Sequence, residues 1–165
     1  MAGKFDPSTV AASEELRLLS FTSDDAFAIG TALRSRIQQH PSGRNAIIDI
    51  RAGAGVGQQL FFATTGAGTL PDNAEWARRK RAAVERWGKS TASLNLKWGK
   101  EGIPAFFGVS EADYAVHGGG FPVRVKGVET LVGTIVVSGL AQEDDHQVIV
   151  DTVTEYIQEQ EKAAK

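Results

Sequence analysis

Apolar residues recur along this chain at two spacings, and the change from one to the other predicts its elements. Over residues 24–40 they recur every three to four positions, which is typical of a helix with one apolar face. The threonine and serine just before this segment can cap a helix, and its first two aspartates favour the first turn. The apolar stripe of the predicted helix consists of Phe27, Ile29, Ala32, Leu33 and Ile37.

Short apolar runs rich in β-branched or aromatic side chains predict strands. Residues 46–50 and 59–65 are two such runs, and the glycine-rich turn between them indicates an antiparallel hairpin. Further strands are predicted at residues 16–21, around Phe106, and at residues 121–125 and 130–138. Further helices are predicted over residues 76–87, 90–98 and from about Gln142 onward.

The order of these elements indicates an α+β fold, with a central antiparallel sheet of about five strands and helices packed on its faces. The length of 165 residues fits one domain, which we place at residues 14–158. Residues 1–13 are small and polar, and residues 159–165 are charged and alanine-rich. We expect the first segment to be flexible and the second to be a C-terminal tail.

Composition narrows the classes of function. A hydrophobic content of 42% and a charged content of 23% are typical of a globular protein. The net charge of −2 and the pI near 5.9 disfavour nucleic-acid binding. The absence of cysteine excludes disulfides, a thiolate nucleophile and cysteine-ligated metals. With no signal-peptide pattern in residues 1–13 and no apolar run of roughly 20 residues, we expect a cytoplasmic protein without membrane contact.

The segment His117 to Pro122, with three glycines in a row, is the most unusual local sequence. Glycine allows positive φ and close approach of the backbone to another group, and a run of free N–H groups can bind an anion. We therefore predict a ligand-binding segment. Its candidate residues are His117, Gly118, Gly119, Gly120, Phe121 and Arg124. The alternative is a flexible turn before a strand, in which the proline fixes the entry.

His146 lies at the start of the last predicted helix and allows two interpretations. It precedes Ile149, Val150 and Val153 at helical spacing, which indicates a structural histidine that faces the sheet. Alternatively, it stands with Asp145 at the rim of a pocket, where it could titrate or bind a ligand. A metal site is not predicted, because the three histidines of the chain form no HExxH-type pair.

A basic cluster, Arg78 to Arg81, lies on the predicted helix that also carries Trp76 and Trp87. Tryptophan and arginine are enriched in protein interfaces, so this helix is a candidate self-association surface. Its candidate interface residues are Trp76, Arg79, Lys80 and Trp87. A solvated basic face is the alternative.

Four separated motifs together resemble one family, the GlcG/HbpS-like haem-degrading-domain proteins, in particular their uncharacterised UPF branch. The motifs occupy residues 68–73, 76–80, 117–122 and 136–140, the last together with residues 145–146. The resemblance implies a profilin-like fold and a homo-oligomer. It also implies a possible link to haem, which some relatives bind or degrade. A haem site in this chain would need His117 or His146 as the axial ligand.

Three functions stay open from sequence alone. The first is an oligomeric domain that binds a small molecule or cofactor in a pocket formed by the residues named around His117 together with His146. The second is an enzyme, haem-degrading or of other small-molecule chemistry, in which one of these histidines performs acid–base work. The third is a structural oligomer that uses the tryptophan-bearing helix. The first two require residues 118–120 to meet the start of the last helix in space.

Overall fold

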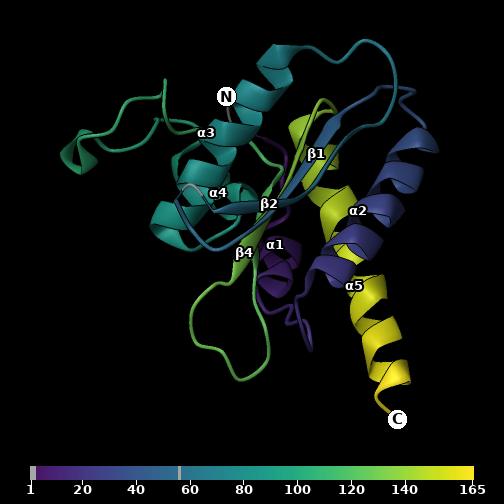
Figure 1. Ribbon diagram of the computed structural model, residues 1–165. Helices are drawn as coiled ribbons and strands as arrows, with labels where there is room; N and C mark the ends of the chain where they lie inside the picture. The colour runs from purple at the N-terminus through teal and green to yellow at the C-terminus, as the bar shows by residue number, and fades with distance from the viewer. Residues whose placement is uncertain (1–2, 56) are drawn as a thin grey trace.

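The computed structural model describes residues 3–55 and 57–165, which fold into a four-stranded antiparallel sheet with helices on both faces (Figure 1). The strand order is β2-β1-β4-β3. The elements in chain order are α1 (Pro7–Ser13), α2 (Ser23–Gln38), β1 (Ile47–Ala52), β2 (Gln58–Thr64), α3 (Pro71–Trp87), α4 (Thr91–Trp98), a 3-10 turn (Ala105–Phe107), β3 (Gly120–Val123), β4 (Gly133–Ser138) and α5 (Gln142–Ala163). The predicted fold class, a mixed fold with an antiparallel sheet and helices on its faces, is confirmed.

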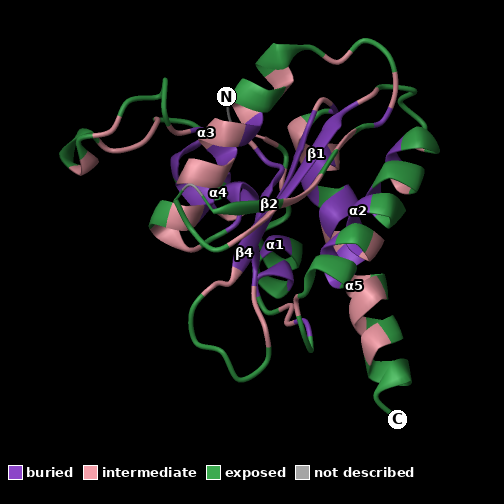
Figure 2. Ribbon diagram, in the orientation of Figure 1, coloured by how far each residue is buried: buried purple, intermediate pink, exposed green. Residues whose placement is uncertain are grey.

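The two central strands, β1 and β4, are covered on both faces, as Figure 2 shows. Ile48 and Ile50 of β1 face the side occupied by α2 and α5, where the main core lies. Ile47 faces the opposite side and packs against Ala77 of α3. Burial on both faces explains why Ile47 and Ile48 of β1 are apolar at adjacent positions instead of alternating with polar residues.

The ends of the long helices follow from local chemistry. Thr22 caps α2, as the sequence allows, and Asp25 completes a reciprocal capping box that was not predicted. Gly88 ends α3 with a φ of 65°, a conformation that glycine adopts without strain. Ile29, Leu33 and Ile37 form the buried stripe of α2. The other two members of the predicted stripe, Phe27 and Ala32, are exposed, which corrects that prediction.

The sheet has one strand fewer than expected. Residues 16–21 form only an isolated parallel bridge, between Leu18 and Val125. The side chain of Gln160 accepts the N–H of Leu19 and donates to the carbonyl of Ser20, so a side chain takes the backbone bonds that a strand would use. Around Phe106 the chain forms a 3-10 turn that ends at Gly108 with a φ of 65°.

The two chain ends are more ordered than the sequence predicts. Residues 7–13, which belong to the segment expected to be flexible, form α1 with Asp6 as its N-cap. Residues 1–2 of that segment lie outside the described residues. The expected C-terminal tail is also helical, because α5 continues to Ala163. Among the described residues, no helix has the length and apolar character needed to cross a membrane.

Candidate functional site

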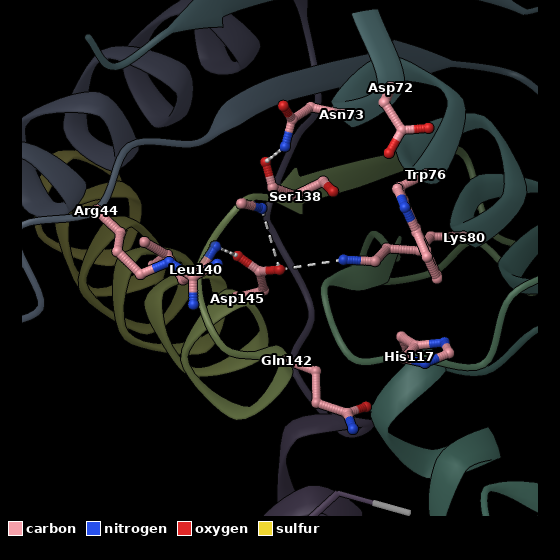
Figure 3. Close-up of a pocket in the computed structure, with 11 residues that line it drawn as sticks. Arg44, Asp72, Asn73, Trp76, Lys80, His117, Ser138, Leu140, Gln142 and Asp145 are labelled. Atoms are coloured by element: carbon pink, nitrogen blue, oxygen red, sulfur yellow. Dashed lines mark hydrogen bonds and ion pairs between the residues drawn. The ribbon is translucent and has the colours of Figure 1, made fainter. Parts of the chain in front are cut away.

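A cavity of about 420 Å³ lies where α3, the loop before β3 and the start of α5 meet (Figure 3). Its volume falls within the range of small-molecule sites, roughly 300–1,000 Å³. The residues that line it are Arg44, Asp72, Asn73, Trp76, Lys80, His117, Ser138, Gly139, Leu140, Gln142 and Asp145.

The glycine segment and the start of α5 meet beside this cavity. The N–H of Gly118 donates to Oε1 of Gln142 over 3.1 Å, and the N–H of Val137 donates to the carbonyl of Gly119 over 2.8 Å. Gly119 has a φ of 119°, and a Cβ at this position would collide with the Val137 carbonyl and with Asp145. Only glycine therefore fits where these distant segments touch.

A buried ion pair forms the floor of the cavity. Nζ of Lys80 donates to Oδ2 of Asp145 and to the carbonyl of Val137, each over 3.1 Å. The Asp145 carboxylate also accepts the N–H of Leu140 over 2.9 Å. Burial raises the pKa of Asp145, while the ammonium of Lys80 and the Leu140 N–H oppose that shift. This network connects α3, β4 and α5 below the cavity.

Aromatic rings form one wall of the cavity. The Trp76 indole meets the His117 imidazole edge to face, with ring centroids 4.8 Å apart. The Arg79 guanidinium stacks on the indole at 4.3 Å. Nδ1 of His117 is buried and has no hydrogen-bond partner in the described chain. Burial, aided by nearby positive groups that include Lys80 and Arg79, lowers the pKa of His117, so its imidazole is neutral at pH 7.

Polar groups from α3 and from the loop before β1 complete the lining. Asn73 accepts the N–H of Leu70 at the start of α3, and its amide donates to the carbonyl of Ser138 over 3.4 Å. Arg44 extends toward the side of the cavity where Leu140 lies, as Figure 3 shows. The Asp145 carboxylate at the floor of the cavity is paired with Lys80. The Arg44 guanidinium at the edge of the cavity is therefore the cation that a ligand in the cavity can contact.

The predicted ligand-binding residues separate into groups. His117 lines the cavity, and Gly118, Gly119 and Gly120 form the backbone behind it. Of the seven predicted residues, only His117 lines the cavity itself. Phe121 lies in the main core, and Arg124 donates to the carbonyl of Gly88.

His146 is only 3% exposed, and it packs against Phe5 and Phe121 at ring-centroid distances of 5.9 and 6.2 Å. Its Nδ1 has no hydrogen-bond partner among the described residues, and burial lowers its pKa to about 4. The structure thus places His146 on the sheet-facing side that its spacing predicts, and not at the rim of the cavity.

Of the four candidate residues on the predicted self-association helix, Lys80 is buried and the other three are half-buried against neighbouring parts of this chain, and self-association through this helix stays a prediction. Lys80 is buried in the ion pair, so including it was wrong. Trp87 packs inside an aromatic cluster with Trp98, Phe107 and Tyr114. Arg79 covers Trp76 and donates to the carbonyl of Glu111. The side chains of the basic run therefore bond to the interior and to adjacent loops of this chain.

Sequence reasoning missed several lining residues. Lys80 had a usable signal, because it lies four positions after Trp76 and three before Ala83, on the stripe that faces inward. Arg44 and Gln142 lie outside the four motifs and gave no local signal, since only the tertiary fold brings them to the cavity. Among the described residues, no group of three or more histidines, cysteines and acidic side chains could hold a metal ion.

Comparisons with known proteins agree with this architecture. The model of the family described as haem degrading protein HbpS-like matches residues 21–154. A UPF0303 protein of Streptomyces avermitilis is 39% identical, over 92% of this chain and 90% of the relative. A UPF0303 protein of Brucella melitensis is also 39% identical, over 84% of this chain and 79% of the relative.

Solved structures share the fold. The crystal structure of the Ybr137w protein is similar with a TM-score of 0.84 and 28% identity, covering 93% of this chain and 89% of that one. A structure described as a PduOC:heme complex is similar with a TM-score of 0.65 and 20% identity, covering 85% of this chain and 95% of that one. At this identity the second likeness concerns the fold alone.

Proposed function

Because the chain belongs to the family of HbpS-like haem degrading proteins, we propose that it binds a small-molecule cofactor in the cavity beside His117, with haem as the candidate. One observation carries the proposal: a neutral imidazole with a buried, unpartnered Nδ1 stands in the wall of a cavity of about 420 Å³. A related fold is described in complex with haem, which supports this choice of ligand.

The residues present fit haem in three respects. A neutral imidazole is a common axial ligand of haem iron, and the depressed pKa of His117 keeps it in that form. Trp76 offers a flat apolar surface on the same wall. Arg44 offers a guanidinium, which suits the carboxylates that haem carries. When bound, haem would supply redox chemistry at its iron, and the chain would bind and orient it.

His146 does not take part in this proposal. It lies in the core between Phe5 and Phe121, and a ligand could reach its imidazole only if that packing opened. Self-association and a cytoplasmic location also belong to the proposal, and family membership supports the first of them.

A hemin titration tests the proposed site. We expect the parent protein to give a saturable Soret band shift, and His117→Ala to lose it while its circular dichroism stays that of the parent. His40→Ala is the matched control, because His40 lies outside the residues that line this cavity. If His117→Ala bound hemin with the affinity of the parent, His117 would not be the ligand and the proposed site would be wrong.

A further inference from the structure

Residues 3–6 cross the start of α5 before α1 begins, and we call them the N-terminal strap. The N–H of Gly3 donates to Oδ1 of Asn95 in α4 over 2.7 Å. The N–H of Lys4 donates to Oε1 of Glu143 in α5, also over 2.7 Å. The strap is therefore fastened to two helices by side chains that accept its backbone N–H groups.

The side chain of Phe5 packs where the wall of the cavity approaches His146. Its ring meets the His146 imidazole edge to face, with ring centroids 5.9 Å apart. It also lies against the glycine segment, because a Cβ at Gly118 would collide with the Phe5 ring and with the carbonyl of Gln142. Gln142 lines the cavity and precedes His146 by four positions, so the two side chains leave the same face of α5 one turn apart. Phe5 therefore covers the place where one turn of α5 leads from the cavity to His146.

The His146 imidazole is buried without compensation. The residue is 3% exposed, and its Nδ1 has no hydrogen-bond partner among the described residues. A buried polar atom without a partner loses its hydration and gains no bond in return, which makes such atoms rare in folded proteins. The rings that pack on His146 belong to Phe5 and Phe121. If the strap moved away, Nδ1 would regain a partner while Phe121 still supported the imidazole.

The strap is held less firmly than the helices beneath it. In the described part of the chain, residues 3–5 make no backbone-to-backbone hydrogen bond. Phe5 is half-buried and Lys4 is exposed. Local opening occurs where few buried contacts hold the backbone, and it does not require global unfolding. The strap can therefore leave its place while the sheet and α5 stay folded.

We propose that the N-terminal strap is a gate, and that its opening gives the cavity a second imidazole, that of His146, beside His117. Two imidazoles form a donor set that suits the iron of haem. A ligand that contacts both imidazoles binds the open state better than the closed one, so its binding favours opening. The second ligand rests on the proposed function, because it needs an iron-containing molecule in the cavity, whereas the gate does not.

Chemical modification of histidine tests the gate in the protein alone. Diethyl pyrocarbonate acylates accessible imidazoles, and peptide mass spectrometry locates the label. We expect His146 to be protected in the parent, and Phe5→Ala to raise its labelling rate about tenfold or more, because this rate follows the population of the open form. Phe5→Leu keeps a large apolar side chain and should restore most of the protection.

The matched control for labelling is Phe106→Ala, because Phe106 is 83% exposed and lies on the 3-10 turn. This variant should label His146 at the rate of the parent. Circular dichroism shows whether each variant is folded. A folded Phe5→Ala variant that labels His146 no faster than the parent would overturn the gate.

The spin state of bound hemin tests the second ligand. Electron paramagnetic resonance distinguishes iron with one imidazole from iron with two, because two imidazoles favour the low-spin state. We expect a larger low-spin fraction in Phe5→Ala than in the parent, and Phe5→Ala combined with His146→Leu should lose that gain. If Phe5→Ala exposed His146 to the label but kept the parent spectrum, His146 would not be a second ligand. A parent that bound no hemin would contradict the cavity proposal and the second ligand with it, whereas the labelling result would still decide the gate.

Discussion

Two histidines of this chain lie in segments that meet in space, but their side chains have different environments. His117 precedes the glycine segment, and His146 directly follows the first turn of α5, near where the two segments meet. Each has a buried Nδ1 without a partner among the described residues, and burial lowers the pKa of each. Yet His117 stands in the wall of the cavity, whereas His146 is packed between aromatic rings in the core.

The start of α5 contributes one side chain to the cavity and the next side chain to the core. Asp145 and His146 are consecutive, so their side chains leave α5 about 100° apart. Asp145 points to the cavity floor and holds Lys80, while His146 points to Phe121 and the core. The cavity side is therefore stabilised by charge and hydrogen bonds, and the core side by apolar packing. Substitutions on the cavity side and on the core side should therefore change the free energy of unfolding for different physical reasons.

The largest effect is expected on the cavity side. Asp145→Asn leaves the Lys80 ammonium buried without its counter-charge, which should lower the free energy of unfolding by about 3–5 kcal/mol. Urea denaturation at pH 7 measures this loss. Lys80→Met combined with Asp145→Asn removes both charges and keeps an acceptor for the Leu140 N–H, so it should be more stable than the single variant. If the single and the double variant were equally stable, an unpaired Lys80 charge would not be the cause of the loss in Asp145→Asn.

On the core side we expect a pH signature. Burial lowers the pKa of His146 from its ordinary value of 6.5 to about 4 in the folded chain, and the carboxylate of Asp151 opposes this shift. The unfolded chain therefore binds more protons between these values, and stability present above pH 6.5 is lost as the pH falls toward 4. At about 1.4 kcal/mol per pKa unit, this loss at pH 4 is roughly 3 kcal/mol.

The variant His146→Leu should remove this part of the acid sensitivity. Urea denaturation of the parent and the variant at pH 7 and at pH 4 isolates the contribution, because the carboxylates titrate in both proteins. His40→Gln is the matched control, because it removes a histidine that lies outside the packing of His146 against Phe5 and Phe121. If the loss of free energy of unfolding between pH 7 and pH 4 were the same in His146→Leu as in the parent, the core would not hold His146 neutral.

Much of the fold could be predicted because its signals are local. The Thr22 cap of α2, the β1–β2 hairpin and the stop at Gly88 each depend on residues close in sequence. The predicted strand at residues 16–21 is reduced to one bridge, from Leu18 to Val125, because the distant Gln160 takes the backbone bonds of Leu19 and Ser20. A pattern of apolar residues cannot reveal a side chain that takes backbone bonds from the far end of the chain.

The site was predicted less completely than the fold. Glycine at residues 118–120 correctly indicated a close approach, and the spacing of His146 correctly favoured the core. The side chains that meet in the cavity come from separate elements, and Arg44 and Gln142 lie outside every motif that the sequence offers. Lys80 was assigned to a candidate self-association surface as part of a basic cluster, although its position on the helix faces inward.

The smallest effect tests the backbone that separates the two histidines. Gly119→Ala forces a residue with a side chain to a φ of 119° and drives its Cβ into the Val137 carbonyl and Asp145. Gly127→Ala has a similar backbone penalty at a φ of 80°, but nothing lies within 4 Å of its Cβ.

The difference between the two variants therefore isolates the close approach from the backbone strain. We expect Gly119→Ala to lose about 2 kcal/mol more than Gly127→Ala in urea denaturation, from overpacking in a tight site. It should also displace Lys80 and Asp145, so hemin binding at the cavity should weaken while the acid sensitivity due to His146 persists. If both variants lost the same stability, residues 118–120 would not be the contact that divides the cavity from the core.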